Sequence, residues 1–139
     1  METATKGLEL EDVAKKDVEE SFVVLCASGF DNMERTRSAV MFATLAASAN
    51  YKTILFCIQK GVEVLVKGAI EQNEVPKPGV PTLSQRLSEA MEMGVEIQSC
   101  TQSMANKKIT EEDLIPGVKS AGAMNLIVLS SKAKGNLSF

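Results

Sequence analysis

The chain has 139 residues, of which 45% are hydrophobic and 24% are charged, and it contains no histidine and no tryptophan. These values are typical of a globular domain of ordinary size and argue against collagen-like and intrinsically disordered classes. A chain without histidine cannot form a Ser-His-Asp triad, an HExxH zinc helix or a histidine general base. Three cysteines, Cys26, Cys57 and Cys100, remain as the candidates for covalent chemistry.

The formal net charge of −3 is unevenly distributed. Residues 1–20 hold seven acidic residues and three lysines, a net charge of −4, so residues 21–139 sum to +1. We expect an acidic arm over residues 1–20 and a single α/β domain over residues 21–139. A near-neutral domain does not attract nucleic acid over long range, and no apolar run approaches the roughly 20 residues of a membrane span. An odd number of cysteines without a CxxC pair favours reduced thiols in the cytoplasm and no metal site.

The first predicted strand is the continuous apolar run of residues 22–27, which is typical of a strand buried on both faces of a parallel sheet. A turn follows, and Asp31 with Glu34 three residues later predicts the start of a helix that continues to Asn50. The turn lacks both GxGxxG and Walker patterns, which favours a cap over a nucleotide cradle. Helical spacing of apolar residues supports the helix at Ala39, Phe42, Ala43 and Ala46.

Two further strands are predicted at residues 53–58 and 95–99, the latter ending at Cys100. Between them we expect a short helix over residues 63–69 and a proline-containing loop over residues 71–82. A capping box that starts at Thr82 predicts a helix that stops at Gly94.

The last part of the chain is predicted to begin with a polar loop or irregular helix over residues 101–109. One helical turn capped by Thr110 and a short helix ending at Ala121 then follow. The apolar, β-branched run of residues 125–130 predicts a fourth strand, and residues 137–139 an edge strand. Right-handed crossovers between these elements give a flavodoxin-like α/β fold, a mostly parallel sheet of four to five strands between helical layers.

Each cysteine lies at the carboxyl end of a predicted strand, or one residue before it. Ligands of open α/β sheets bind outside these strand ends, so we expect the three thiols to lie toward the functional edge. Large apolar neighbours favour core packing and a raised pKa for Cys26 and Cys57 over reactivity. Cys100 lies between Ser99 and Thr101, where we expect it to reach water, and a reactive and a structural role stay equally open.

The order of these motifs resembles the DsrE/DsrF-like family, which includes sulfur-relay proteins of tRNA thiolation and of dissimilatory sulfur metabolism. The resemblance covers about residues 21–130. The motifs that carry it are Gly29-Phe30-Asp31, Arg35-Thr36-Arg37 in an Ala-rich helix, Gly61-Val62, and the block Gly94-Val95, strand, Cys100, Ile109 and Asp113-Leu114.

The resemblance implies a three-layer α/β/α sandwich that assembles as a dimer, trimer or hexamer. In sulfur-transferring members, a cysteine after the third strand accepts sulfur as a persulfide from a small carrier protein, and Cys100 stands at this position. The following loop has no second thiol, and Lys60 stands where several relatives carry an acidic residue. The missing second thiol argues against a resolving cysteine, and the position of Cys100 after the third strand is the reason to expect it to be catalytic. The candidate binding residues are Asp31, Arg35, Lys60, Gly61, Thr101 and Met104.

The resulting hypothesis is a sulfur carrier or sulfurtransferase that takes sulfane sulfur onto Cys100, as a persulfide or thiosulfonate, and passes it to a partner protein without a cofactor. Such exchange needs an accessible thiolate but no histidine. Two alternatives stay open: a non-catalytic subunit of an oligomeric sulfur-relay complex, and a small-ligand-binding module.

Overall fold

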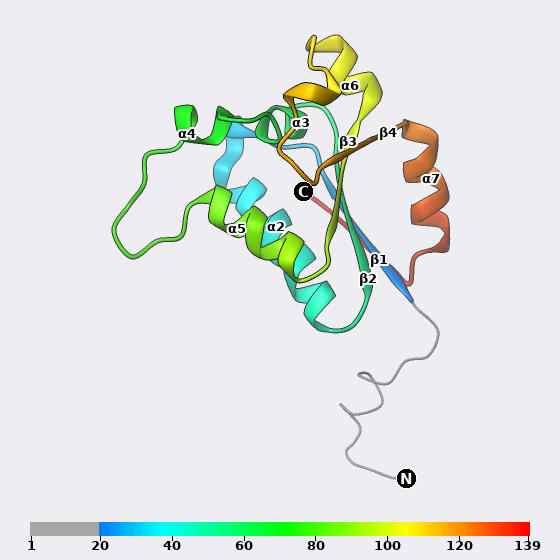
Figure 1. Cartoon of the computed structure of the whole chain (residues 1–139). Helices are drawn as coiled ribbons and strands as arrows, with labels where there is room; N and C mark the ends of the chain where they lie inside the picture. The colour runs from blue at the N-terminus through cyan, green and yellow to red at the C-terminus, as the bar shows by residue number, and fades with distance from the viewer. Residues whose placement is uncertain (1–19) are drawn as a thin grey trace.

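The computed structural model describes residues 20–139 (Figure 1), so the acidic arm predicted over residues 1–20 lies, apart from Glu20, outside the described residues. A five-stranded sheet with the order β4-β3-β2-β1-β5 forms the centre, and every neighbouring pair is parallel. The strands are β1 (Ser21–Cys26), β2 (Lys52–Cys57), β3 (Glu96–Cys100), β4 (Lys119–Ala121) and β5 (Gly135–Ser138). The predicted α/β class is confirmed.

Helices lie on both faces of this sheet, with α2 and α5 on one side and α7 on the other (Figure 1). The helices are α2 (Met33–Ser48), α3 (Gly61–Val64), α4 (Ala69–Asn73), α5 (Leu83–Glu92), α6 (Thr101–Asn106) and α7 (Ala123–Lys132), with 3₁₀ turns η1 (Phe30–Asn32) and η2 (Glu111–Asp113). Within residues 20–139, none of these helices has the length and apolar character needed to cross a membrane.

The central strands are buried because their apolar runs leave no polar face. Val24 and Leu55 are paired in register and belong to the same core as Ala39 and Ala43 of α2. Both alanines are fully buried, and their small side chains allow the helix to approach the sheet closely. The predicted capping box at Thr82 and the predicted cap at Thr110 are present. The cap predicted at Asp31 is wrong, because α2 is capped by Asn32, whose side chain accepts from the N–H of Arg35.

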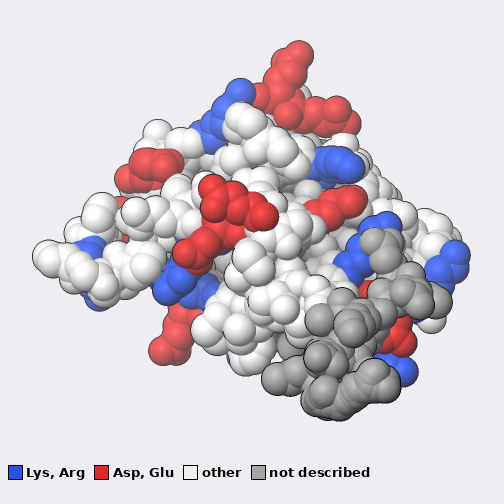
Figure 2. All heavy atoms as spheres, turned by 60° about the horizontal axis from the view of Figure 1, so that its bottom comes forward, with Lys and Arg blue, Asp and Glu red and all other residues white. Residues whose placement is uncertain are grey.

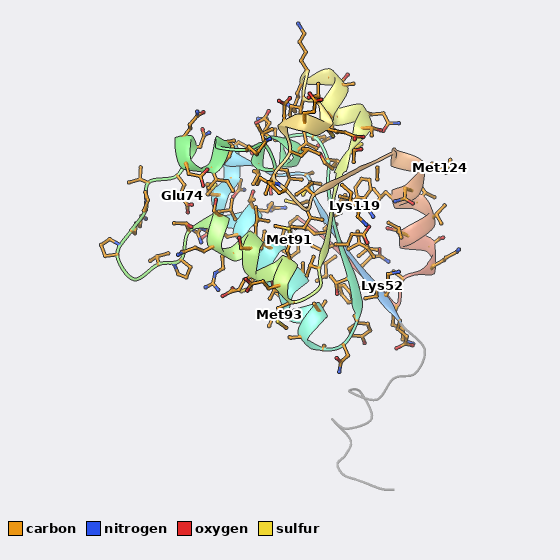
Figure 3. The ribbon with its side chains drawn as sticks, in the orientation of Figure 1. Lys52, Glu74, Met91, Met93, Lys119 and Met124 are labelled. Atoms are coloured by element: carbon orange, nitrogen blue, oxygen red, sulfur yellow. The ribbon has the colours of Figure 1, made fainter. Side chains whose placement is uncertain are left out.

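The fourth strand predicted at residues 125–130 is wrong, because this segment lies in α7. Leu126 and Leu129 are half-buried against the core, whereas Ile127 and Val128 are exposed. Met124 is 71% exposed and projects from α7 away from the sheet (Figure 3). Apolar residues on both sides of a helix produce a continuous run, which is also the pattern of a buried strand.

The short helix expected to end at Ala121 is also wrong, since the chain there forms β4 and pairs with β3. β4 is a three-residue edge strand that contains Lys119 and Ser120, so it carries no apolar pattern. The predicted edge strand is confirmed, with β5 over residues 135–138 pairing with β1. The helix predicted over residues 63–69 is largely wrong, because α3 ends at Val64 and α4 begins only at Ala69 and runs into the predicted loop as far as Asn73. Gly68, just before α4, has a positive φ of 81°.

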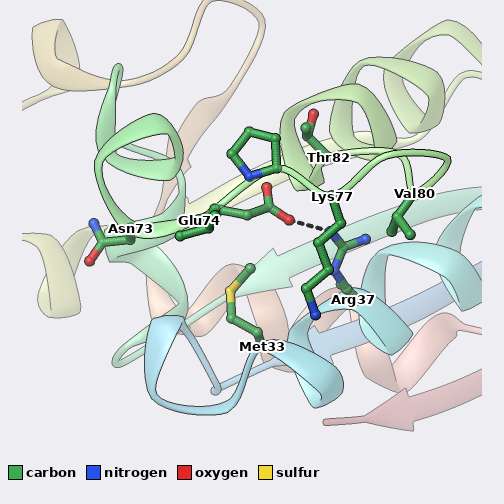
Figure 4. A pocket seen from close by; sticks show the side chains of 9 residues that line it. Met33, Arg37, Asn73, Glu74, Lys77, Val80 and Thr82 are labelled. Atoms are coloured by element: carbon green, nitrogen blue, oxygen red, sulfur yellow. Dashed lines mark hydrogen bonds and ion pairs between the residues drawn. The ribbon is translucent and has the colours of Figure 1, made fainter.

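The loop between α4 and α5 is anchored by one carboxylate (Figure 4). Glu74 forms an ion pair with Arg37 of α2, and its Oε1 accepts a hydrogen bond of 2.9 Å from the backbone N–H of Leu83. A hollow of about 270 Å³ lies beside this pair. The Arg37 guanidinium and the Glu74 carboxylate together hold the proline-containing loop against α2, which gives Arg37 a structural role.

Two turns interlock at the carboxyl ends of β1 and β2. A Cβ placed at Gly61 would lie 2.5 Å from the carbonyl oxygen of Cys26, and a Cβ at Gly29 would clash with the carbonyl of Lys60. The Cys26 carbonyl also accepts a 2.9 Å hydrogen bond from the N–H of Ile58. The backbone is therefore in contact at positions where only glycine fits.

We predict that Gly61→Ala lowers the free energy of unfolding by about 1–3 kcal/mol, because the methyl group would push against the backbone of β1. Urea denaturation measures this change. Gly122→Ala is the matched control, since its nearest neighbour would be Thr101 Oγ1 at 3.9 Å, and it should cost less than about 1 kcal/mol. Equal effects of the two substitutions would contradict the close packing.

Candidate functional site

The three cysteines lie at the carboxyl ends of three adjacent strands, as predicted. Cys26 ends β1, Cys57 ends β2 and Cys100 ends β3, and all three are free thiols. Their exposed fractions are 2%, 4% and 4%. The expectation that Cys100 reaches water is therefore wrong for this conformation, since it is as buried as Cys57.

The strand register divides the thiols between the two faces of the sheet. Cys26 is paired with Cys57, and Cys57 is paired with Ser99. Paired residues of parallel strands point to the same face, and consecutive residues point to opposite faces. Cys26, Cys57 and Ser99 therefore form one row on the α2 face, and Cys100 lies on the α7 face. One edge of the sheet thus carries two separate thiol environments.

Cys26 lies in a polar pocket of the α2 face. Its Sγ donates to the carbonyl oxygen of Ser28 at 3.3 Å and lies 3.6 Å from Ser28 Oγ. Thr36 of α2 donates to the same Ser28 Oγ at 3.1 Å. Hydrogen bonding to Cys57, followed by hydrogen bonding to Ser28, lowers the pKa of Cys26 to about 7 against the opposing effect of burial.

The raised pKa predicted for Cys26 is therefore wrong, because sequence neighbours alone do not include these hydrogen bonds. The pKa of Cys57 is raised well above its usual value, as predicted. Its hydrogen bond to Cys26 is the first cause and burial is the second. The proton of the pair is held on Cys57, which leaves Cys26 as the more acidic thiol.

Cys100 contacts a different set of groups. Its thiol donates to Gln102 Oε1 at 3.4 Å. The same oxygen accepts hydrogen bonds of 3.2 Å from Thr101 Oγ1 and from the backbone N–H of Ala123 at the start of α7. The exposed side chain of Gln102 thus lies against the thiol and links α6 to α7.

A hollow of about 460 Å³ lies at the same strand ends, lined by Ala27, Asp31, Gln59, Lys60, Ser103, Asn106 and Lys107. Asp31 and Lys60 form an ion pair of 3.6 Å, and Lys107 pairs with Glu63 at 2.8 Å. The pKa of Asp31 is lowered mainly by the Gly29 N–H, with Lys60 contributing. Both lysines are balanced by carboxylates, so the hollow is polar but carries no excess cation.

The structure brings two of the predicted binding residues, Asp31 and Lys60, into one hollow. Arg35 lines a different hollow with Ser138 and Phe139. Gly61 is buried in the turn packing described above, and Met104 is buried in the core. Thr101 is exposed beside Cys100 and shares the oxygen of Gln102.

Ser103 and Gln102 were missed from the sequence. The N–H of Gln59, a residue with a positive φ of 52°, donates to Ser103 Oγ at 2.8 Å and so joins β2 to α6. The sequence signal that could have identified them is their position two and three residues after Cys100. Within residues 20–139, no three His, Cys, Asp or Glu side chains are grouped so that they would hold a metal ion.

Charge over the visible surface is mixed, with acidic and basic side chains interspersed (Figure 2). The fold and the site together define an α/β protein with a parallel sheet, helices on both faces and thiols at the strand ends. The chain belongs to the DsrE/DsrF-like family, whose sequence profile matches residues 20–139.

Two archaeal relatives support this assignment. The uncharacterized protein MJ0989 of Methanocaldococcus jannaschii is 30% identical over 118 residues, which cover 85% of this chain and 98% of the relative. The uncharacterized protein MK0008 of Methanopyrus kandleri is 31% identical over 94 residues, which cover 68% of this chain and 73% of the relative.

Two solved structures share the fold. The ychN protein from E. coli superposes with a TM-score of 0.67 at 18% identity, covering 86% of this chain and 99% of that chain. Protein MTH1491 of Methanobacterium thermoautotrophicum, of unknown function, has a TM-score of 0.63 at 16% identity, covering 88% of this chain and 100% of that chain. At this identity the likeness shows the fold alone.

We predict that a Cys100→Ser variant shows one thiolate forming near pH 7, at Cys26, and none at Cys57 until well above its usual range. The pKa of Cys26 is lower in the folded chain than its unfolded value of about 8.5. Ionisation of Cys26 therefore contributes its full stabilisation of the fold above about pH 8.5, and this stabilisation is lost as the pH falls through 7. The ultraviolet absorbance of the thiolate measures the titration.

The further substitution Cys57→Ala removes the first cause of the shift, so the pKa of Cys26 should return toward its ordinary value. Cys26→Ala should abolish the transition near pH 7. Two thiols that both ionise above their ordinary range would contradict the assignment.

Proposed function

We propose that the protein is a sulfur carrier of a sulfur-relay system and that Cys100 is its acceptor. Membership of the DsrE/DsrF-like family suggests a place in sulfur relay. The single observation that favours Cys100 is its position at the end of β3, where the partner of its thiol is an exposed side chain. In this proposal a rotation of Gln102 uncovers the sulfur, whereas Cys26 and Cys57 lie between the sheet and α2.

The proposed step is a sulfur exchange that needs no histidine. The thiolate of Cys100 attacks the outer sulfur of a donor persulfide, R–S–SH. A new S–S bond forms at Cys100, the donor S–S bond breaks, and the donor leaves as R–S⁻. A thiolate of the acceptor then attacks the outer sulfur and regenerates the Cys100 thiolate. We propose a small sulfur-carrier protein as donor and a homo-oligomer as the working form.

The burial of Cys100 favours a second candidate, a non-catalytic subunit of an oligomeric sulfur-relay complex. A thiol that is 4% exposed and hydrogen-bonded has the environment of a structural cysteine. The two candidates differ in one measurable property, the reaction of Cys100 with sulfane sulfur in the folded protein.

We predict that incubation with thiosulfate, tetrathionate or a persulfidated carrier adds mass to Cys100. Intact mass should rise by about 32 Da for a persulfide, or by about 112 Da for the thiosulfonate that tetrathionate forms, and thiol reductant should remove either group. The matched control is the Cys26→Ser/Cys57→Ser double variant, which should gain the same mass because Cys100 remains. Equal gain by Cys100→Ser would overturn the assignment, and no gain by the wild-type protein would favour the non-catalytic subunit.

We also predict that Gln102→Ala speeds alkylation of Cys100 by iodoacetamide about 3- to 10-fold, because it removes the acceptor that lies against the thiol. Peptide mapping of alkylated Cys100 over time gives the rate. Asn106→Ala on the same helix is the matched control and should leave the rate unchanged. A rate that is the same in all three proteins would mean that Gln102 does not limit access.

A further inference from the structure

A row of three small, buried side chains crosses the sheet on the α2 face at the carboxyl ends of β1, β2 and β3. Its members are Cys26, Cys57 and Ser99, which are paired in register and are 2%, 4% and 0% exposed. Ser99 Oγ has no hydrogen-bond partner within residues 20–139. Buried hydroxyl groups normally have a hydrogen-bond partner, so an unpartnered hydroxyl in the same row as two thiols indicates that the row has a role besides packing.

The backbone geometry allows the two sulfurs to be joined. Neighbouring strands lie about 4.8 Å apart, and disulfides span Cα separations of about 4.4–6.8 Å. The Cys26 carbonyl is tied to the residue after Cys57 by the hydrogen bond from Ile58. The buried Gly61 packs against both cysteines, since a Cβ there would lie 3.3 Å from Cys57 Cβ. A bridge at this strand spacing would leave the strand pairing unchanged.

We propose that Cys26 and Cys57 form a second thiol site, a buried dithiol that a small peroxide oxidises to a reversible disulfide. The burial of both sulfurs selects the class of oxidant, because a protein or a bulky disulfide cannot reach them in the folded chain. The proposed entry for a molecule of the size of hydrogen peroxide is the 460 Å³ hollow at the strand ends, which is lined by Ala27 and Gln59, close to the two cysteines in the chain. This site is independent of the sulfur relay proposed for Cys100.

The chemistry balances with the two thiols and one peroxide. The Cys26 thiolate attacks one peroxide oxygen, the O–O bond breaks, and the hydroxide that leaves takes a proton from solvent. Cys26 is then a sulfenic acid. The sulfur of Cys57 attacks the Cys26 sulfur, the S–S bond forms, and the departing hydroxide takes the Cys57 proton. The thiols lose two electrons and the peroxide becomes two waters.

The surrounding groups suit these roles. The lowered pKa of Cys26, caused first by its hydrogen bond with Cys57, provides the thiolate for the first attack. Ser99 is paired with Cys57 in the row, and its buried hydroxyl is unpartnered within residues 20–139. Thiol–disulfide exchange with a small reductant restores the dithiol.

The test uses the full chain with Cys100→Ser, so that neither the sulfur relay nor the third thiol contributes. Hydrogen peroxide should lower the intact mass by about 2 Da, and peptide mapping should find the Cys26 and Cys57 peptides joined. Dithiothreitol added in denaturant should reverse both results. The further substitution Cys57→Ser should instead give a sulfenic acid at Cys26, about 16 Da heavier and trapped by dimedone when the protein is unfolded in its presence.

Three outcomes would overturn the proposal. The first is that both thiols stay reduced while the folded chain is treated. The second is that each cysteine gains oxygen without a cross-link, and the third is that disulfides form only between chains, seen on a non-reducing gel. The peptide map of the Cys100→Ser protein decides between these even where the second substitution prevents folding, which circular dichroism monitors.

Discussion

The in-register pairing of β1, β2 and β3 is the constraint on which the chemistry of this protein depends. Side chains of a strand alternate between faces, so a slip of one residue would exchange every side chain of that strand between the α2 face and the α7 face. Cys26 and Cys57 share a face because they are paired, and Cys100 is opposite because its neighbour Ser99 is the residue paired with Cys57. The close contact of Gly61 with the Cys26 carbonyl holds this register at the carboxyl ends of β1 and β2, where the cysteines lie.

The two faces are unequal, and this asymmetry gives the thiols different surroundings. On the α2 face, alanines bring the helix close, and Cys26 and Cys57 belong to the core, with Ser28 and Thr36 as the polar groups beside Cys26. On the α7 face, Gln98 accepts a 2.9 Å hydrogen bond from Asn125 of α7 and donates to Glu96. A polar layer under α7 therefore surrounds the strand that carries Cys100. All three thiols are buried, so the two faces differ in the polarity of the groups beside each thiol and not in its exposure.

Sequence patterns predict the elements that are stabilised by continuous or periodic apolar contacts. The central strands and α5 follow from such patterns, and the capping box at Thr82 locates the start of α5. The pattern fails at α7, because the exposed Ile127 and Val128 extend the apolar run around the helix, and at β4, which is held by pairing alone. The strand-end positions of the thiols were predictable. Their division between faces was not, since it depends on register between segments far apart in the chain.

The absence of histidine determines how a thiolate is stabilised here. No imidazolium is available, and Lys60 and Lys107 at the strand ends are already paired with carboxylates. Cys26 instead relies on neutral donors, the Cys57 thiol first and Ser28 second. Cys100 has Gln102 beside it, and a carboxamide carries an acceptor oxygen and a donor NH₂ group at the same end. Turning that amide exchanges acceptor for donor, so the residue that lies against the Cys100 thiol is also the one placed to hydrogen-bond a thiolate or persulfide. The sulfur exchange proposed for Cys100 transfers no proton to the chain, so neutral donors would be sufficient for it, in contrast to the hydrolytic reactions that a chain without histidine cannot support by the usual route.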